Sequence, residues 1–217
     1  MELKLVRTAE LTPPVIAKPG RKATDEELIR LVQRGSREAF SQLMSRYSSR
    51  IMNFVFQIVH DREAAEDLAQ ETFVRVYLNA HRYRDVARFS TWIFTIAANL
   101  AKNEVRNRSR RPTLPLAEEV GLSSDEGLVS VVLEDGGLQP DEETEAGELR
   151  RDVARAIDVL PPKYREVFVL REVEGFSYHE IADMAGLPKG TVKSRINRAR
   201  LRFREEIEKL RGPGGGS

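Results

Sequence analysis

The sequence lacks several features on which common classes of protein depend. It contains no cysteine, which excludes disulfide bonds and thiolate sites. No apolar run approaches the roughly 20 residues that a membrane span needs. Residues 1–15 lack the apolar centre of a signal peptide. These absences predict a cytoplasmic protein with no membrane insertion.

Residues that build catalytic and metal sites are also scarce. The three histidines, His60, His81 and His179, are scattered along the chain and are expected to be surface or capping residues. There is no His-x-x-x-His pair and no glycine-rich phosphate loop. We therefore predict no enzymatic activity, no metal and no cofactor, which argues against a nucleic-acid enzyme.

Two stretches lack charge of one sign. Residues 112–149 contain no Lys or Arg but 11 acidic residues, and residues 184–204 contain no acid but seven basic residues. Outside residues 112–149 the chain therefore has 34 − 11 = 23 acidic residues and all 35 of its basic residues. We interpret the chain as two basic lobes, which favour nucleic acid, joined by an acidic linker that either imitates nucleic acid or stays away from it.

Apolar residues recur at helical spacing, and the first lobe shows no convincing strand alternation. The prediction is an all-α fold: two small helical domains joined by a flexible acidic linker, the C-terminal one a helix-turn-helix. The predicted parts are an irregular tail (1–23), a first helical domain (24–111), the linker (112–149), the helix-turn-helix domain (150–211) and a flexible tail (212–217).

Four helices are expected in the first domain. A capping box at residues 24–27 begins a helix that ends near Arg34, and a second helix covers residues 37–60. Asp61 caps a third, from Arg62 to about residue 81, and Ser90 caps a fourth, which Pro112 ends. The residues expected to face inward in the third and fourth helices are Leu68, Phe73, Val76, Tyr77, Ala80, Trp92, Ile93, Ile96, Ala97, Leu100 and Val105.

The second domain is expected to hold four more helices, over residues 149–160, 163–174, 177–185 and from about 190 onward. Residues 177–180 form another capping box, and Gly186 supplies the turn before the last helix. Two helices joined by a turn of about four residues, the second one basic, are typical of a helix-turn-helix.

The last helix has an apolar stripe and an opposite basic face. In a helix-turn-helix the N-terminal residues of the second helix meet base edges in the major groove. The residues expected there are Lys193, Ser194, Asn197 and Arg198. Arg195, Arg200 and Arg202 lie toward the flanks, where phosphates are expected. Leu201, on the exposed side, is either a partner contact or an ordinary exposed leucine.

The fourth helix of the first domain combines aromatic rings, amides and cations, which suits unstacked single-stranded bases. Its residues of this kind are Trp92, Phe94, Asn99, Lys102, Asn103 and Arg106. The alternative is that both rings belong to the core. On the third helix, Asp67, Gln70 and Glu71 form one polar patch, which is either a protein-docking face or a solvated surface.

The motifs DLAQETF, RFSTWIFTIAANLAKNEVRNRSRR and LPPKYREVFVLREVEGFSYHEIADMAGLPKGTVKSRINRARLRF occur in this order. In their order and spacing the chain resembles a bacterial RNA polymerase sigma factor of the extracytoplasmic-function (ECF) group of the sigma-70 family. The resemblance covers about residues 27–111 and 150–208.

The resemblance implies that Asp67, Gln70 and Glu71 dock on the β′ clamp helices of core RNA polymerase. It implies that the loop over residues 83–90 and the next helix recognise the −10 element as a melted non-template strand. The corresponding residues are Arg88, Phe89, Trp92, Asn99, Lys102, Asn103 and Arg106. The second domain would read the −35 element as duplex DNA through Lys193, Ser194, Arg195, Asn197, Arg198 and Arg200.

The implied function is promoter recognition, melting of the −10 region and direction of transcription initiation at a specific regulon, with the catalysis left to the polymerase. The implied partners are the polymerase, including its β flap, promoter DNA and an anti-sigma factor. Three alternatives explain less of the sequence. These are a helix-turn-helix regulator that acts without polymerase docking, such as a response-regulator output domain, a nucleic-acid enzyme, and a two-lobed adaptor.

Overall fold

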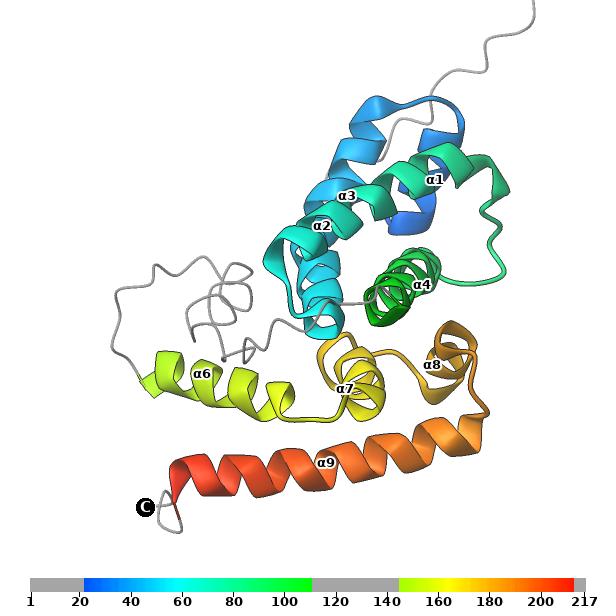
Figure 1. Cartoon of the computed structure of the whole chain (residues 1–217). Coiled ribbons are helices and arrows are strands. Elements are labelled where there is room, and N and C mark those ends of the chain that lie inside the picture. The colour runs from blue at the N-terminus through cyan, green and yellow to red at the C-terminus, as the bar shows by residue number, and fades with distance from the viewer. Residues whose placement is uncertain (1–21, 111–144, 213–217) are drawn as a thin grey trace, which may run out of the picture.

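The structure is a computed structural model that describes residues 22–110 and 145–212. Within these ranges every regular element is helical, which confirms the all-α prediction (Figure 1). Residues 111–144, which hold most of the predicted acidic linker, lie outside the described residues, as do residues 1–21 and 213–217.

The first lobe consists of α1 (Asp25–Gln33), α2 (Arg37–Val59), α3 (Arg62–Asn79), the short 3₁₀ helix η1 (Ala80–Arg82) and α4 (Phe89–Arg110). Side chains cap the first three helices. Thr24 and Glu27 form the predicted capping box, with each side chain accepting from the other's backbone amide. The Asp61 carboxylate accepts from the amide of Ala64 at 3.0 Å, which confirms the predicted cap of α3.

The predicted cap of α4 is wrong. The helix begins at Phe89, so Ser90 lies inside its first turn. The amide of Phe89 donates instead to Glu26 Oε1 of α1, at 3.2 Å. A carboxylate beside free amides at a helix N-terminus is favourable, and here α1 supplies it from 63 residues away.

Packed aromatic rings form much of the first lobe's core. Tyr47, Tyr83, Phe89 and Trp92 contact one another in edge-on or tilted geometry, with ring centroids 5.3–6.1 Å apart. Phe73, Val76, Ile93, Ala97 and Leu100 are buried as predicted. Two residues predicted to face inward do not, because Tyr77 and Val105 are each more than two-fifths exposed.

The second lobe consists of α6 (Glu145–Asp158), α7 (Pro162–Phe168), the π-helical segment η3 (Val169–Val173), α8 (Tyr178–Ala185) and α9 (Lys189–Arg211). Two boundaries differ from the prediction. Helix α6 begins inside the segment predicted as linker, and the helix predicted over residues 163–174 widens into a π-helix at Val169. The backbone then turns at Gly175, whose φ of +76° favours glycine.

The helix-turn-helix forms as predicted. Ser177 and Glu180 make the capping box of α8, and Gly186 ends that helix with φ +66° in the left-handed region. Val192, Ile196 and Ala199 of α9 are fully buried against the lobe. The far half of α9 lies against α6 and α7, with the Phe168 and Phe203 rings 5.0 Å apart.

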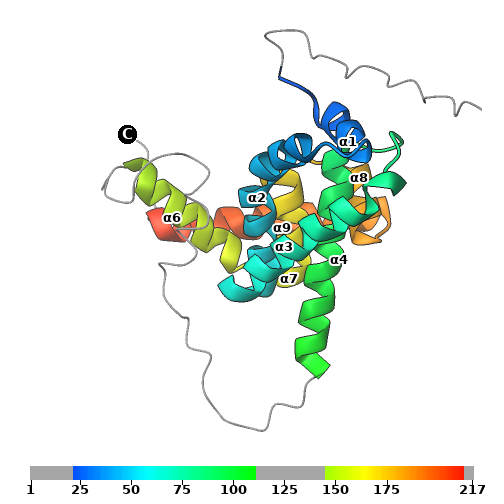
Figure 2. The ribbon, with the colours of Figure 1, turned by 90° about the horizontal axis from the view of Figure 1, so that it is seen from above.

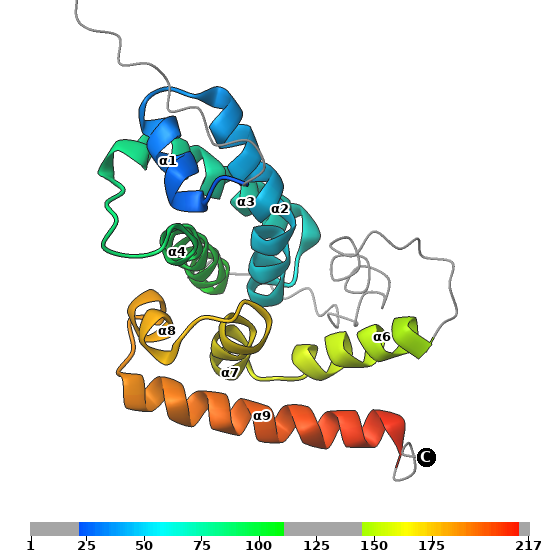
Figure 3. The same cartoon turned by 180° about the vertical axis from the view of Figure 1, so that it is seen from behind.

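The two lobes contact each other directly. In Figures 1 and 3, α7 and α8 lie between the first lobe and α9, so α9 is on the side of the second lobe that faces away from the first. The contacts join α4 to α8 and α2 to α7. We call this packing the closed arrangement. It leaves the C-terminal end of α4 projecting beyond the other helices (Figure 2).

Arg165 anchors the closed arrangement. Its side chain is buried and donates four hydrogen bonds to backbone carbonyls, one of them to Gln57 in the first lobe at 3.1 Å. The other three acceptors are Ile157, Asp158 and Leu160, at the end of α6 and just beyond it. Burial lowers the pKa of Arg165, and the nearby Asp158 partly offsets this. The carbonyl acceptors suit a buried guanidinium, because helix C-termini carry partial negative charge.

Candidate nucleic-acid interface

The N-terminal half of α9 presents a continuous basic and polar surface. Lys193, Ser194, Asn197 and Arg198 are all exposed, on the side opposite the buried stripe. The sequence placed these four residues on one face, and the structure brings them together there. Cations and amides aimed outward from the first turns of such a helix fit the hydrogen-bonding edges of bases in a major groove.

Flanking cations of α9 are held by neighbours in the same lobe. Arg200 donates to Glu172 Oε1 through Nε at 3.0 Å and Nη2 at 2.7 Å. The guanidinium of Arg202 lies 5.4 Å from the centre of the Tyr164 ring, and a hydrogen bond from Arg198 lowers the pKa of that tyrosine. Arg195 is half-buried. Arg195, Arg200 and Arg202 flank the four-residue face, where the phosphates of a bound duplex would lie. A phosphate at Arg200 would have to displace Glu172.

Helix α4 carries the predicted single-strand face. Asn99, Asn103 and Arg106 are exposed along it, and Arg106 Nη2 donates to Asn103 Oδ1 at 2.8 Å. Lys102, on the same side of α4, is half-buried. Its Nζ lies 2.8 Å from Glu166 Oε1 of α7, an ion pair that joins the two lobes.

The aromatic residues of the predicted −10 set divide into two groups. Phe89 is fully buried in the aromatic cluster, and its ring is unavailable to a base in this structure. Phe94 is equally buried. Trp92 is half-buried at the edge of the same cluster, against Tyr83. Of the two rings to which the core alternative applied, it holds for Phe94 and only in part for Trp92. Phe89 belongs to the core as well, where it helps to fix the position of the loop and of α4.

The loop before α4 is exposed but anchored at several points. Tyr83 is buried and its hydroxyl donates to the Ala87 carbonyl at 2.8 Å, while Val86 is 92% exposed at the tip. The side-chain amide of Gln33 donates to the carbonyl of Tyr83 at 3.0 Å. Arg88 is exposed at the end of this loop, where it helps to lower the pKa of Glu180. A fixed loop with an outward arginine is suited to hold a flipped base and its phosphate.

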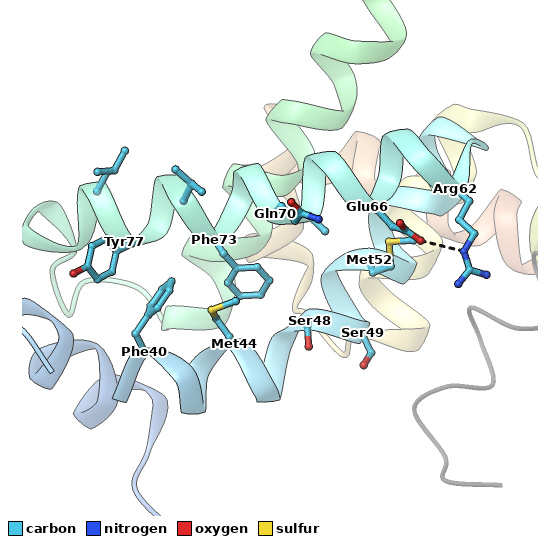
Figure 4. Close-up of a pocket in the computed structure, with 13 residues that line it drawn as sticks. Phe40, Met44, Ser48, Ser49, Met52, Arg62, Glu66, Gln70, Phe73 and Tyr77 are labelled. Atoms are coloured by element: carbon cyan, nitrogen blue, oxygen red, sulfur yellow. Dashed lines mark hydrogen bonds and ion pairs between the residues drawn. The ribbon is translucent and has the colours of Figure 1, made fainter. Parts of the chain in front are cut away.

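The polar patch of α3 borders an apolar groove that the sequence did not reveal. Asp67 and Gln70 are exposed, and Glu71 is half-buried and paired with Arg75 at 2.7 Å. The groove has a volume of about 690 Å³ and runs between α2 and α3 (Figure 4). Its lining includes Phe40, Met44, Met52, Gln70, Phe73, Val74, Tyr77 and Leu78.

Val74, Tyr77 and Leu78 are exposed apolar side chains at the groove. Of these three, only Tyr77 has a sequence-based prediction, and it placed that residue in the core. An apolar groove beside acidic side chains is typical of a docking site for a helical partner. In the described ranges, 22–110 and 145–212, no helix is both long and apolar enough to span a membrane, and no cluster of potential metal ligands occurs.

Together these features define a two-lobed helical protein with a helix-turn-helix, an exposed basic face on α9 and a separate polar face on α4. Comparison with known proteins agrees with this class. The model of sigma-70 region 2 matches residues 43–111, and that of sigma-70 region 4 matches residues 150–203.

The chain is 35% identical to the RNA polymerase sigma-H factor of Pseudomonas aeruginosa over 192 residues, which are 87% of this chain and 94% of the relative. It is 33% identical to the ECF RNA polymerase sigma factor SigW of Bacillus subtilis over 182 residues, or 84% and 96% of the two chains. The chain therefore belongs to the ECF sigma factors of the sigma-70 family, and this membership points to a non-enzymatic role.

Solved structures support the fold. The sigma factor RpoE in complex with the anti-sigma factor NepR, from Bartonella quintana, matches with a TM-score of 0.57 and 24% identity, over 78% of this chain and 96% of that one. CnrH in complex with the cytosolic domain of CnrY matches with a TM-score of 0.58 and 22% identity, over 85% and 97%.

Proposed function

We propose that this chain works in the cytoplasm as the promoter-recognition subunit of RNA polymerase. It docks on core polymerase, reads a −35 element as duplex and a −10 element as melted strand, and leaves the chemistry of RNA synthesis to the polymerase. One observation supports the proposal most strongly. A single ECF sigma chain has both an exposed, acid-free face on α9 and a separate polar face on α4.

The residue assignments are part of the proposal. Lys193, Ser194, Asn197 and Arg198 read bases of the −35 element, and Arg195 and Arg200 contact phosphates. Asn99, Lys102, Asn103 and Arg106 line the −10 strand together with Trp92 and Arg88. Phe89 contributes by holding the loop in place, since its ring lies in the core.

Docking on polymerase is assigned to α3. Asp67, Gln70 and Glu71 would contact the β′ clamp helices, and the neighbouring groove supplies apolar area that the patch alone lacks. The same surface suits an anti-sigma factor, because a partner that covers it would block the polymerase. The second lobe would bind the β flap, and the two tethered lobes gain effective concentration when both elements are present.

In vitro transcription tests the proposal. The purified chain is added to core polymerase on a library of genomic promoter fragments, and start sites are mapped. We expect initiation at a defined set of sites that share two elements at fixed spacing, and none from core alone. Duplex binding at defined sites without any initiation would favour a helix-turn-helix regulator that acts without polymerase docking, and would refute the proposal.

A further inference from the structure

Two methionines line the groove between α2 and α3. Met44 and Met52 are eight positions apart on α2, so their side chains leave the same face of that helix, and Figure 4 shows both along the groove. Met44 is 39% exposed and Met52 is half-buried. Water and small solutes therefore reach the sulfur-bearing side chains of this groove.

Within residues 22–110 and 145–212, accessible sulfur is confined to this groove. The chain has four methionines and no cysteine. Met1 lies outside the described ranges, and Met184, in α8, is only 2% exposed. A reactive thiolate usually takes up an oxidant before a thioether does, and this chain has no thiol. Among the described residues, an oxidant of sulfur is therefore directed to Met44 and Met52.

The surroundings of the two methionines are largely apolar. The rings of Phe40 and Tyr77, which also line the groove, are 5.0 Å apart, and Leu78 on the same groove is 64% exposed. A thioether is apolar and adapts its shape to a partner, so Met44 and Met52 suit such a surface. A sulfoxide carries a polar oxygen, which would lose its water when a partner covers the groove.

We propose that Met44 and Met52 form an oxidation site at which peroxide prevents docking on core polymerase. The inference rests on the proposed function, in which this groove supplies part of the polymerase-binding surface, and it adds a regulation to that surface. The reduced chain docks through an apolar groove, and the oxidised chain presents sulfoxide oxygens there instead. Partner groups that pack against apolar side chains offer these oxygens no hydrogen-bond donor, so docking weakens.

The reaction needs only the thioether and hydrogen peroxide. A sulfur lone pair attacks one peroxide oxygen, the O–O bond breaks and an S–O bond forms. The other oxygen leaves as hydroxide and takes the proton of the transferred oxygen, which gives water. Sulfur loses two electrons and the peroxide gains them. Methionine sulfoxide reductases, with a thiol as electron donor, return the sulfoxide to the thioether, so the modification is reversible.

Oxidation of the full chain tests the inference. The wild type, the double variant Met44→Leu/Met52→Leu and the control Met184→Leu are each treated with hydrogen peroxide, and catalase then removes the oxidant. Peptide mass spectrometry gives the extent of oxidation at each methionine. Binding to core polymerase is titrated for each protein before and after treatment, and the ratio of its two Kd values is compared among the three proteins.

We expect Met44 to be oxidised before Met52, and both before Met184, in the order of their exposure. Oxidation should weaken the binding of the wild type and of Met184→Leu by about tenfold or more, because a polar oxygen without a donor is then buried in the interface. The double leucine variant has no sulfur in the groove, so treatment should leave its own Kd unchanged. Methionine sulfoxide reductases should restore binding by the oxidised wild type.

A second variant, Met44→Gln, places a polar amide at the exposed position and should weaken binding without any oxidant; circular dichroism verifies that each protein keeps its helices. Full binding by a chain whose groove methionines are oxidised would overturn the inference, as would a folded chain in which Met44 resists peroxide or an equal loss in the double leucine variant. If the untreated wild type binds polymerase and initiates at defined sites, these failures refute only the oxidation site. An untreated wild type that does not bind polymerase would refute the proposed function and the inference with it.

Discussion

The Arg165 guanidinium, in the second lobe, donates a hydrogen bond of 3.1 Å to the backbone carbonyl of Gln57, in the first. The two residues are 108 positions apart, and the same guanidinium also serves the end of α6. One buried side chain thus joins the ends of two helices from different lobes.

Replacing Arg165 by lysine should therefore destabilise the chain although the charge is kept. A lysine ammonium cannot reach the four carbonyls that the planar guanidinium serves, and a buried carbonyl without a donor costs about 1–3 kcal/mol. We expect Arg165→Lys to lower the free energy of unfolding by about 2 kcal/mol in urea titrations followed by circular dichroism. Arg151→Lys, at an exposed position of α6, is the control and should change it by less than about 0.5 kcal/mol.

His60 should make stability depend on pH. Burial and the nearby Arg165 cation lower its pKa, while Asp158, whose Oδ1 lies 3.3 Å from Nδ1, partly opposes them. The folded state then binds this proton less readily than the unfolded state, in which the histidine pKa is about 6.5. The contribution of His60 is fully present above that pH and is lost as the pH falls toward the lower folded value.

The comparison that isolates this effect uses His60→Asn, because asparagine tolerates the left-handed backbone of His60, with φ of +52°. The difference in free energy of unfolding between wild type and variant should shift against the wild type between pH 7.5 and pH 5. A difference that stays constant over this range would contradict the prediction.

Base reading by α9 predicts a loss of discrimination. Ser194→Ala and Arg198→Ala together should reduce the preference for the native −35 sequence over a mutated one. Each lost base contact should remove about 1–3 kcal/mol of that preference. The measurement is competition binding of duplex promoters at fixed salt. Arg204→Gln, outside the four-residue face, should weaken both duplexes alike; an unchanged preference in the double variant would refute base reading.

Docking through α3 predicts a charge-sensitive interaction with core polymerase. Reversing both charges in the double variant Asp67→Arg/Glu71→Arg should weaken binding to core polymerase at least tenfold in a pull-down titration, because like charges then meet across the interface. Glu63→Arg, an exposed position in the first turn of the same helix, is the matched control. Equal capture of polymerase by all three proteins would remove the docking assignment.

Loss of the capping box at α8 should weaken the helix-turn-helix. Ser177 Oγ accepts from the Glu180 amide at 3.2 Å, and Ser177→Ala leaves that amide without its partner. We expect a decrease of about 1 kcal/mol in the free energy of unfolding. Thermal unfolding monitored by circular dichroism measures it, and Ser177→Asp, which can still accept this hydrogen bond, should restore most of the loss.

Local sequence signals predicted the elements well. The boxes at Thr24 and Ser177 and the turn at Gly186 each depend on residues within four positions of one another, so the sequence contains all the information needed. Ser90 shows the limit of this reasoning. A serine before an apolar run is a good local cap. In the structure, however, the amide of Phe89 donates to the Glu26 carboxylate of α1, a contact between distant segments that no local pattern predicts.

The sequence predicted only some of the functional surfaces, because local patterns do not report contacts between distant segments. Helical periodicity placed Lys193, Ser194, Asn197 and Arg198 on one face correctly. It also placed Tyr77 inward, since periodicity identifies an apolar face without saying whether this chain or a partner covers it. The pairing of Lys102 with Glu166 joins segments from two lobes, and only the tertiary structure reveals it.

Helix α9 also acts as a rigid arm. It has 23 residues, so its ends are about 33 Å apart. Its reading residues lie at one end, and near the other end Arg211 lies 3.6 Å from Asp152 of α6, the helix that continues from the acidic segment. Asp152 of α6 therefore lies about four to five helical turns of α9 away from the residues proposed to read bases. If α9 reads the −35 element, the length of this helix is a fixed contribution to the spacing between the two promoter elements.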